Sequence, residues 1–521
     1  MFFKNKSLAT LFLAFLFVFP VFATSIRKLT ILHLNDTHGH FWKNKDGEGG
    51  APALKTLIDR IRKEVASEGG YVLLLSAGDV NTGTPASDLL HAEPDFVAMN
   101  MLKFDAMTLG NHEFDPPRSV LATQQQMATF PFLSANIYDK NSKQRLFQTH
   151  LDKDFDGLKV TVFGLTTEDT PKRTNPRSVQ DLHFRPVIEE AKDLVPSLRD
   201  KADLLIGLTH IGHYPGGHYA PNAPGDETLA QAVNGIDFIL GGHTQTTVYP
   251  PDTQNGTKIL QANEWGKYLG RIDISYDVDS KTIVESKYHL IPINQLKAEA
   301  NQFSGEERYQ GEYLPEDPEM LKVLEHYQSQ LGEKFKQVVA HFEDDFIGRP
   351  AHLDKETNLG RLIAQSNAEI LSGDIGIINK GGVRLNIPHG DVTYQDILTL
   401  FPFKNSLCSV DFGAKELKNY FEQIKDIIHL YGVTLYKNPN GQIIKIKVGE
   451  EELDLNSDQK KFRLVTNDFL AQGGDDHPVI THHPTFKQTE VDVLQAIIDF
   501  FHTHPVIKDK DFSQEHFLSL P

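Results

Sequence analysis

The sequence has very little cysteine and a deficit of basic residues. Cys408 is the only cysteine among 521 residues, so no intrachain disulfide can form. The 52 lysines and arginines are outnumbered by 70 aspartates and glutamates, which gives a formal charge of −18. Such a surface is not built to neutralise nucleic-acid phosphates, so we expect no nucleic-acid polymer as a partner. The charge of an anionic substrate must be met locally.

Long apolar runs are missing after the N-terminus. Lys4 and Lys6 precede an apolar run from Leu8 to Ala23, which predicts a secretory signal peptide over residues 1–23. An uncleaved anchor helix is the alternative, but the run contains Pro20 and is short for the about 20 residues of a membrane span. We therefore expect a periplasmic or secreted protein with no membrane attachment after cleavage.

The length of the chain predicts at least two domains, since a single compact core rarely grows so large. Apolar runs of strand character alternate with helical stretches from about residue 26 to 300, as in layered α/β domains. We expect a first domain over 24–316, a linker helix or hinge over 317–341, and a mixed second domain over 342–521. No coiled coil or cysteine pair calls for a dimer, so we expect a monomer.

Polar side chains follow five of the apolar runs in the first domain. Open α/β sheets place their functional sites beyond the carboxyl ends of their strands. The residues, in chain order, are Asp36 and His38; Asp79; Asn111, His112 and Asp115; His210; and His243 and Gln245.

Taken singly, each of these residues has an ordinary explanation as a turn residue or a solvated histidine. The repetition at five strand ends weakens that explanation. Aspartate, histidine and asparagine suit divalent ions such as zinc and manganese, and about seven ligands are too many for one tetrahedral site. Two metal ions sharing a carboxylate fit the number, and such pairs activate water and stabilise a transferring phosphoryl group.

The ordered blocks NDTHGH, GDVNTG, GNHEFD, SAN, THIGHYPGGH, NAPGDE and GGHTQT resemble the calcineurin-like metallophosphoesterase domain of the 5′-nucleotidase family. The similarity continues through TNLGRLIA, INKGGVR, FPFKN and DFLAQGGDDHP in the second domain. It is strongest toward bacterial periplasmic members that hydrolyse 5′-nucleotides and UDP-sugars. The resemblance implies a four-layer αββα first domain, joined by a helix to an α/β (α+β) substrate-recognition domain.

The resemblance also assigns roles to residues. One metal ion would be held by Asp36, His38, Asp79 and Gln245, and the second by Asp79, Asn111, His210 and His243. His112 would be the catalytic histidine, oriented by Asp115, although an acid before two prolines can also be a simple turn residue. The implied substrate-binding residues are Arg349, Asn379, Arg384, Phe403, Asn405, Phe469 and Asp475.

In the family, two aromatic rings sandwich the nucleobase and an acid takes the ribose hydroxyls. Phe403, Phe469 and Asp475 match these positions, although either phenylalanine could be an ordinary core residue. Stacking on π faces tolerates any base. Two departures put phosphate binding in question, because Leu353 stands where a second arginine is expected and Lys404 replaces a small residue. Lys355 could substitute for that arginine. Its ammonium group would supply the charge but not the two parallel hydrogen bonds of a guanidinium group.

We therefore expect a secreted hydrolase with two divalent metal ions, which could be Zn, Mn, Co or Mg. Its substrates would be nucleoside 5′-monophosphates such as AMP, with UDP-sugars and other nucleotides in addition. Three alternatives stay open. They are a 2′,3′-cyclic-nucleotide phosphodiesterase or a thiosulfate-oxidising hydrolase of the same fold, and a secreted nucleotide-binding protein without catalysis.

Overall fold

The structure is a computed structural model that describes residues 25–44, 47–174, 176–218, 222–295, 313–349 and 355–519. The expected signal peptide over residues 1–23 lies outside the described residues, and so does Leu353. No helix in the described part of the chain is long and apolar enough to cross a membrane.

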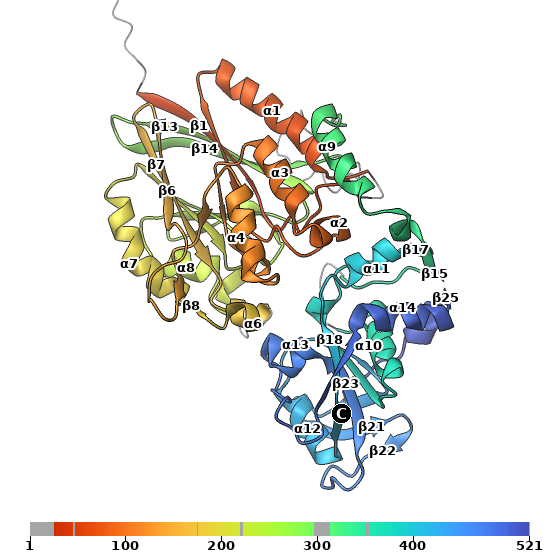
Figure 1. Cartoon of the computed structure of the whole chain (residues 1–521). Helices are drawn as coiled ribbons and strands as arrows, with labels where there is room; N and C mark the ends of the chain where they lie inside the picture. Colours follow the sequence, from red (N-terminus) through yellow and green to blue (C-terminus); the bar gives the residue numbers. More distant parts are fainter. Residues whose placement is uncertain are drawn as a thin grey trace, which may run out of the picture.

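The first domain is built on two six-stranded sheets that pack face to face (Figure 1). The first has the order β14-β13-β1-β2-β3-β4, with bounds Thr282–Pro292, Tyr268–Asp277, Ile26–Leu34, Tyr71–Ser76, Ala106–Thr108 and Phe132–Leu133. The second has the order β11-β12-β10-β9-β7-β6, with bounds Thr247–Gln254, Thr257–Ala262, Phe238–Leu240, Leu204–His210, Leu158–Thr166 and His150–Phe155.

The inner strands β1, β2, β7 and β9 are buried on both faces over most of their length, which explains why their sequences read as continuous apolar runs. Leu29 and Ile31 of β1 face the second sheet, whereas Leu32 faces a helical layer. That layer comprises α1 (Ala51–Ser67), α3 (Glu93–Leu102) and α9 (Pro318–Ser329). On the opposite side, α7 (Val187–Arg199) and α8 (Asp226–Ala232) cover the second sheet. The expected four-layer αββα arrangement is confirmed.

Short elements complete the first domain around these layers. They are α2 (Pro85–Leu89), α4 (Arg118–Met127), α5 (Thr170–Arg173), α6 (Pro176–Val179), and the small sheet of β5 (Ile137–Asp139) and β8 (Leu182–Phe184).

The helix expected over 317–341 is shorter than the apolar spacing indicates. It ends at Ser329, and Gly332 then takes a positive φ of 75° that turns the chain. Val338 and Val339, counted as helical from their spacing, start strand β15 (Val338–Phe342) instead. Moreover, α9 belongs to the first domain by packing, because its buried Met320 and Leu324 join the core beneath α1.

The second domain mixes helices with three small sheets (Figure 1). Its central sheet has the order β19-β16-β23-β18-β24, with bounds Ile428–Tyr431, Ile375–Asn379, Phe462–Asn467, Ser406–Phe412 and Lys487–Asp492. The others are β17-β15-β25 and β22-β21-β20-β26, with further bounds Gly390–Thr393, Val506–Ile507, Glu451–Glu452, Ile443–Val448, Val433–Lys437 and Phe517–Ser519. The helices are α10 (Asn358–Ile370), α11 (Tyr394–Leu400), α12 (Ala414–Gln423), α13 (Asp468–Ala471) and α14 (Val493–Thr503).

The two large sheets come into close contact where Gly164 of β7 meets Leu133 of β4. A Cβ atom on Gly164 would lie 2.6 Å from backbone atoms of Leu133. We expect Gly164→Ala to lower the free energy of unfolding by about 1–3 kcal/mol or more, because backbone atoms cannot move aside as a side chain can. Urea denaturation of the first-domain transition measures the loss.

Gly207→Ala on the adjacent strand is the matched control. The nearest atom to a Cβ there is Cζ of the Phe163 side chain, 3.2 Å away. Since a side chain can rotate slightly, the loss should be clearly smaller than for Gly164→Ala. Equal losses would contradict a special constraint at the contact between the sheets.

Candidate functional site

The polar residues predicted from the strand ends lie together at one edge of the double sheet. β1, β2 and β3 run parallel, as do β9 and β10, so their carboxyl ends meet. Asp36 and His38 follow β1, Asp79 follows β2, and Asn111 follows β3. His210 ends β9, whereas His243 and Gln245 follow β10.

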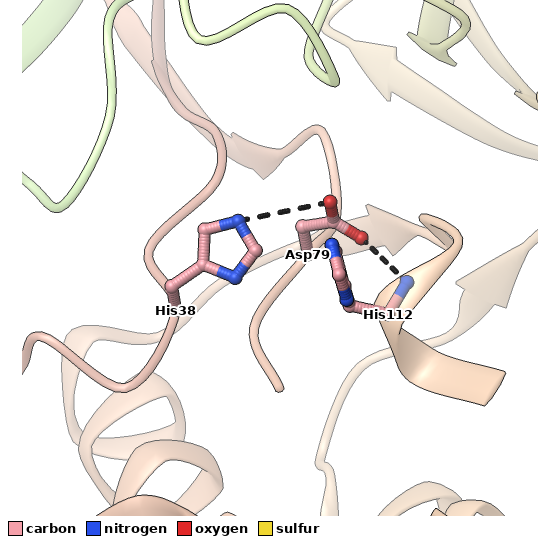
Figure 2. Close-up of side chains that lie close together, drawn as sticks. All are labelled: His38, Asp79 and His112. Carbon is pink, nitrogen blue, oxygen red and sulfur yellow. Dashed lines mark hydrogen bonds and ion pairs between the residues drawn. The ribbon is translucent and has the colours of Figure 1, made fainter. Parts of the chain in front are cut away.

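Asp79 lies at the centre of this cluster. Figure 2 shows it between His38 and His112, with the backbone N–H of His112 donating to Asp79 Oδ1 over 2.9 Å. The second carboxylate oxygen lies 3.8 Å from His38 Nε2 and 2.9 Å from His210 Nε2. Asp79 therefore faces ligand atoms from both sheets, as a carboxylate shared by two ions must.

Backbone carbonyls fix the orientation of two of the histidine rings. His210 Nδ1 donates to the carbonyl of Ala77 over 2.7 Å, and His38 Nδ1 donates to the carbonyl of Thr82 over 2.8 Å. In a neutral ring, His210 Nε2 carries a lone pair that faces Asp79 Oδ2 over 2.9 Å, whereas His38 Nε2 accepts a hydrogen bond from Gln245 Nε2 over 2.9 Å. His210 Nε2 has no hydrogen-bond donor, and it lies against Asp79 Oδ2. A cation between the two acceptors removes this conflict.

Protonation of His210 Nε2 is the other way to resolve the contact between these two acceptors. Burial disfavours a charged ring, yet Asp79 and Asp36 raise the pKa of His210 to about 10. His210 Nε2 therefore lies where positive charge is favoured, and Nδ1 of the same ring is held by a backbone carbonyl. Metal-ligating histidines have this arrangement. Two overlapping groups, His38–Asp79–His112 and Asp79–His210–His243, have ligand atoms close enough to hold an ion. The cluster is compatible with a dinuclear metal site.

The backbone of the cluster is strained. Five of the seven predicted ligand residues have left-handed φ values between 47° and 79°, namely Asp36, His38, Asp79, His243 and Gln245. Residues other than glycine rarely adopt this conformation, and each such residue costs of order 1–3 kcal/mol. The surrounding hydrogen bonds must therefore hold the loops in place.

Glu113 provides much of that support. Its carboxylate, fully buried, accepts the backbone N–H groups of Asp79, Val80, Asn81 and Gly110 at 2.7–3.2 Å. One side chain thus joins the loop after β2 to the loop after β3. The sequence patterns do not single out Glu113, although it stands within the GNHEFD block, directly after His112.

His112 is held by Asp115, as the sequence predicts. His112 Nδ1 lies 2.5 Å from Asp115 Oδ2. The Thr82 and Thr174 hydroxyls donate to the two oxygens of Asp115 over 2.8 and 2.7 Å, which keeps the carboxylate facing the ring. Burial disfavours the charged ring, but Asp115 and Asp79 raise the pKa of His112 above its usual value. Neither threonine is indicated by the sequence patterns.

A cleft of about 530 Å³ lies between the two domains beside the cluster. Its size falls within the range of small-molecule sites. Lining residues from the first domain include Asp79, Asn111, His112, Asp115, His243 and Gln245. All seven predicted substrate-binding residues line it from the second domain, namely Arg349, Asn379, Arg384, Phe403, Asn405, Phe469 and Asp475.

Two arginines of the second domain reach the metal-ligand cluster. Arg349 donates to Gln245 Oε1 and lies 3.3 Å from Glu264. Arg384 Nη2 lies 3.4 Å from His38 Nε2. Burial, with the nearby charge of Arg349, lowers the pKa of Arg384 to about 10. The two arginines therefore bring positive charge to the end of the cleft nearest the cluster. A bound anion there would reduce the repulsion between them.

Lys404, one of the two departures from the family pattern, and Lys355, the possible substitute for the missing arginine, differ in their placement. Lys404 is exposed and lines the cleft, so it adds positive charge there. Lys355 is exposed and is not among the residues that line the cleft. It therefore does not stand in for the missing arginine in this structure.

Contacts across the cleft close its far side. Asp475 accepts hydrogen bonds from Arg173 of the first domain over 2.5 Å and from Asn379 over 2.6 Å. Beside it, Lys172 pairs with Asp476 over 2.8 Å. Phe403 lies 6.3 Å from the His112 ring, between the centres of the rings. Asn405 donates to Asp468 over 2.9 Å. Arg173 is a cleft residue that the sequence patterns do not indicate.

Comparisons with known proteins agree with this architecture. Residues 29–246 match the calcineurin-like phosphoesterase family, and residues 338–482 match the 5′-nucleotidase C-terminal domain family. A protein described as "Protein UshA" from Yersinia enterocolitica is 41% identical, with 90% of each chain covered. A "5'-nucleotidase" from Vibrio parahaemolyticus is 40% identical and covers 94% of this chain and 92% of its own length.

Among solved structures, the 5′-nucleotidase precursor from Thermus thermophilus superimposes with a TM-score of 0.80 at 25% identity. That match covers 95% of this chain and 99% of the other. The similarities in sequence and structure extend over both domains and the cleft between them. The chain belongs to the 5′-nucleotidase family of calcineurin-like phosphoesterases.

Proposed function

We propose that the protein is a metal-dependent 5′-nucleotidase, which hydrolyses nucleoside 5′-monophosphates to nucleoside and phosphate. The observation that carries the proposal is the composition of the cleft. It joins a metal-ligand cluster and two arginines at one end to Phe469 and a paired aspartate at the other, with Phe403 beside His112 and Arg384. A phosphate linked to a nucleoside presents the complementary groups in the same order. UDP-sugars, which carry two phosphates on a uridine, are proposed as further substrates.

Asp36, His38, Asp79 and Gln245 would hold one ion, and Asp79, Asn111, His210 and His243 the other. When bound, the two ions supply positive charge for the phosphoryl oxygens and activate the attacking water. Three imidazoles among the ligands favour Zn²⁺, Mn²⁺ or Co²⁺ over Mg²⁺, which prefers oxygen ligands.

The remaining groups act on the substrate. His112, charged and oriented by Asp115, donates hydrogen bonds to the phosphoryl oxygens as negative charge develops there. Arg349 and Arg384 bind the phosphate in the mouth of the cluster. The rings of Phe403 and Phe469 pack on the base, and Asp475 accepts from the ribose hydroxyls, with Asn405 and Asn379 beside them. Since these groups come from both domains, the substrate must bridge the cleft.

We also propose that the domains meet at the segment 330–337, between α9 and β15, rather than within a long helix. We propose export by a cleaved signal peptide over residues 1–23. A cyclic-nucleotide phosphodiesterase is the second candidate, because the same phenylalanines accept linear and cyclic nucleotides alike.

The direct test measures phosphate and nucleoside release from AMP, UDP-glucose and 2′,3′-cyclic AMP. The protein from residue 24 onward is first treated with a chelator, and each divalent ion is then restored separately. We expect hydrolysis of AMP to vanish with the chelator and to return with Zn²⁺, Mn²⁺ or Co²⁺. Faster hydrolysis of the cyclic nucleotide would favour the second candidate. No turnover with any ion, despite bound metal, would contradict both.

Replacement of the catalytic histidine tests its assigned role. We expect His112→Ala to lower kcat for AMP by about 10² or more while metal content stays unchanged, as for the loss of a charged or acidic catalytic group. Steady-state kinetics and metal analysis of the same preparation measure both quantities. Near-normal turnover in a variant that retains its metal would contradict the role.

The pairing with Asp115 predicts a change in pH dependence. Asp115 raises the pKa of His112, so the charged ring persists to higher pH and kcat should fall only as pH rises through that pKa. In Asp115→Asn the pKa drops, and the alkaline limb of the kcat profile should move to lower pH. Thr174→Val, which removes one hydrogen bond to the carboxylate, is the control and should shift the limb less. An unmoved limb in Asp115→Asn would contradict the pairing.

Base recognition is tested by substrate comparison. We expect Phe469→Ala to raise KM for AMP about tenfold, corresponding to the about 1–3 kcal/mol of one stacked base. A small aryl phosphate, which lacks the nucleoside, should keep its KM. Equal losses on both substrates would mean that Phe469 is only structural.

A further inference from the structure

A third group of potential metal ligands lies outside the cleft. It consists of His213, Glu227 and Asp252, whose ligand atoms all lie within 4.8 Å of one another. These residues come from three separate elements. His213 follows β9 three residues after His210, Glu227 is the second residue of α8, and Asp252 lies in β11. None of them lines the cleft or belongs to the cluster around Asp79.

The two carboxylates are oriented toward the same nitrogen. Glu227 Oε2 accepts from the backbone N–H of Gly217 over 2.7 Å, and Asp252 Oδ1 accepts from Gln254 Nε2 over 2.9 Å. Their other oxygens face His213 Nε2, Oδ2 of Asp252 at 2.9 Å and Oε1 of Glu227 at 3.9 Å. Hydrogen bonds that fix one oxygen and leave the other free to bind are typical of metal-ligating carboxylates.

The charged groups of this cluster face one another. Glu227 is 5% exposed, and its carboxyl group lies within hydrogen-bond reach of Asp252 and also faces His213 Nε2. No lysine or arginine of the described chain pairs with Glu227 or Asp252. A single proton on His213 Nε2 can serve only one of the two oxygens facing it. A divalent cation would serve all three atoms at once, whereas protonation requires one proton on the ring and a second shared between the two carboxyl groups.

The spacing matches that of the cluster at the cleft. There, His210 Nε2 and Asp79 Oδ2 are 2.9 Å apart, and His38 Nε2 and Asp79 Oδ2 are 3.8 Å apart. The corresponding pairs around His213 are 2.9 and 3.9 Å. We propose that His213, Glu227 and Asp252 form a separate structural site for a divalent transition-metal ion, preferably Zn²⁺. One imidazole and two carboxylates are ordinary zinc ligands, and water can complete a tetrahedron.

The ion would fasten the segment between β9 and α8 to β11. That segment begins directly after the predicted ligand His210 and places Tyr214 and Asn222 on the cleft. Asn222 Oδ1 in turn accepts a hydrogen bond from Arg173 over 2.6 Å. The site thus stabilises one wall of the cleft without touching the substrate, and it does not depend on the proposed function.

Metal analysis tests the proposal. Protein loaded with ZnCl₂ and freed of excess ion should contain about three zinc ions per chain, and Glu227→Gln/Asp252→Asn about two. The control Asp279→Asn/Glu285→Gln removes two exposed acids from the β13–β14 hairpin and should keep about three. The rise in Tm on adding zinc should be smaller in the first double variant than in the control. Equal zinc contents in wild type and the first double variant would overturn the proposal.

A second background separates this site from the catalytic ions. Asp79→Asn/His210→Ala removes the shared ligand and one other ligand of the predicted dinuclear centre. We expect about one zinc ion to remain in this variant, and none after Glu227→Gln/Asp252→Asn is added, with folding checked by circular dichroism. Zinc content that does not change on adding the second pair of substitutions would overturn the proposal, whatever the activity toward AMP.

Discussion

The site depends on one buried carboxylate that binds no substrate. Glu113 accepts backbone N–H groups from the loops after β2 and β3, and so fixes Asp79 relative to Asn111 and His112. Ligand residues in left-handed conformations would otherwise relax toward ordinary backbone angles. Glu113 therefore holds one of the strained residues, Asp79, from within the first domain, before any second-domain residue or ion takes part.

The second domain completes a cleft with opposite chemistry at its two ends. Arg349 and Arg384 lie against ligand residues of the first domain, where burial makes their crowded charge costly. An anionic phosphoryl group lowers that cost, so the same crowding that disfavours the empty cleft favours a bound phosphate. At the other end, Arg173 is already paired with Asp475, so its positive charge is largely balanced. This difference supports the proposed orientation of a nucleotide, with its phosphate toward Arg349 and Arg384.

The sequence predicts the layered fold and the cluster well, for a physical reason. Buried parallel strands must be apolar along their whole length, so a polar residue at their end marks the sheet edge, as for Asp79. Supporting residues cannot be predicted in this way. Thr82 and Thr174 act through hydrogen bonds to Asp115, and these contacts are defined only in the folded chain. The end of α9 shows another limit. Apolar residues continue at helical spacing past its last turn, but a positive φ at Gly332 interrupts the helix, and periodicity alone does not register that break.

Two ion pairs join the domains at the far side of the cleft, and they differ in exposure. The Lys172 side chain is 47% exposed, whereas those of Arg173 and Asp475 are 13% and 9% exposed. Dissolved salt screens the first pair far more than the second. Ionic strength should therefore affect the outer contact between the domains more than the buried one. Salt weakens the Lys172–Asp476 pair first and leaves the Arg173–Asp475 pair in place. The second pair also occupies the carboxylate that we propose binds the ribose.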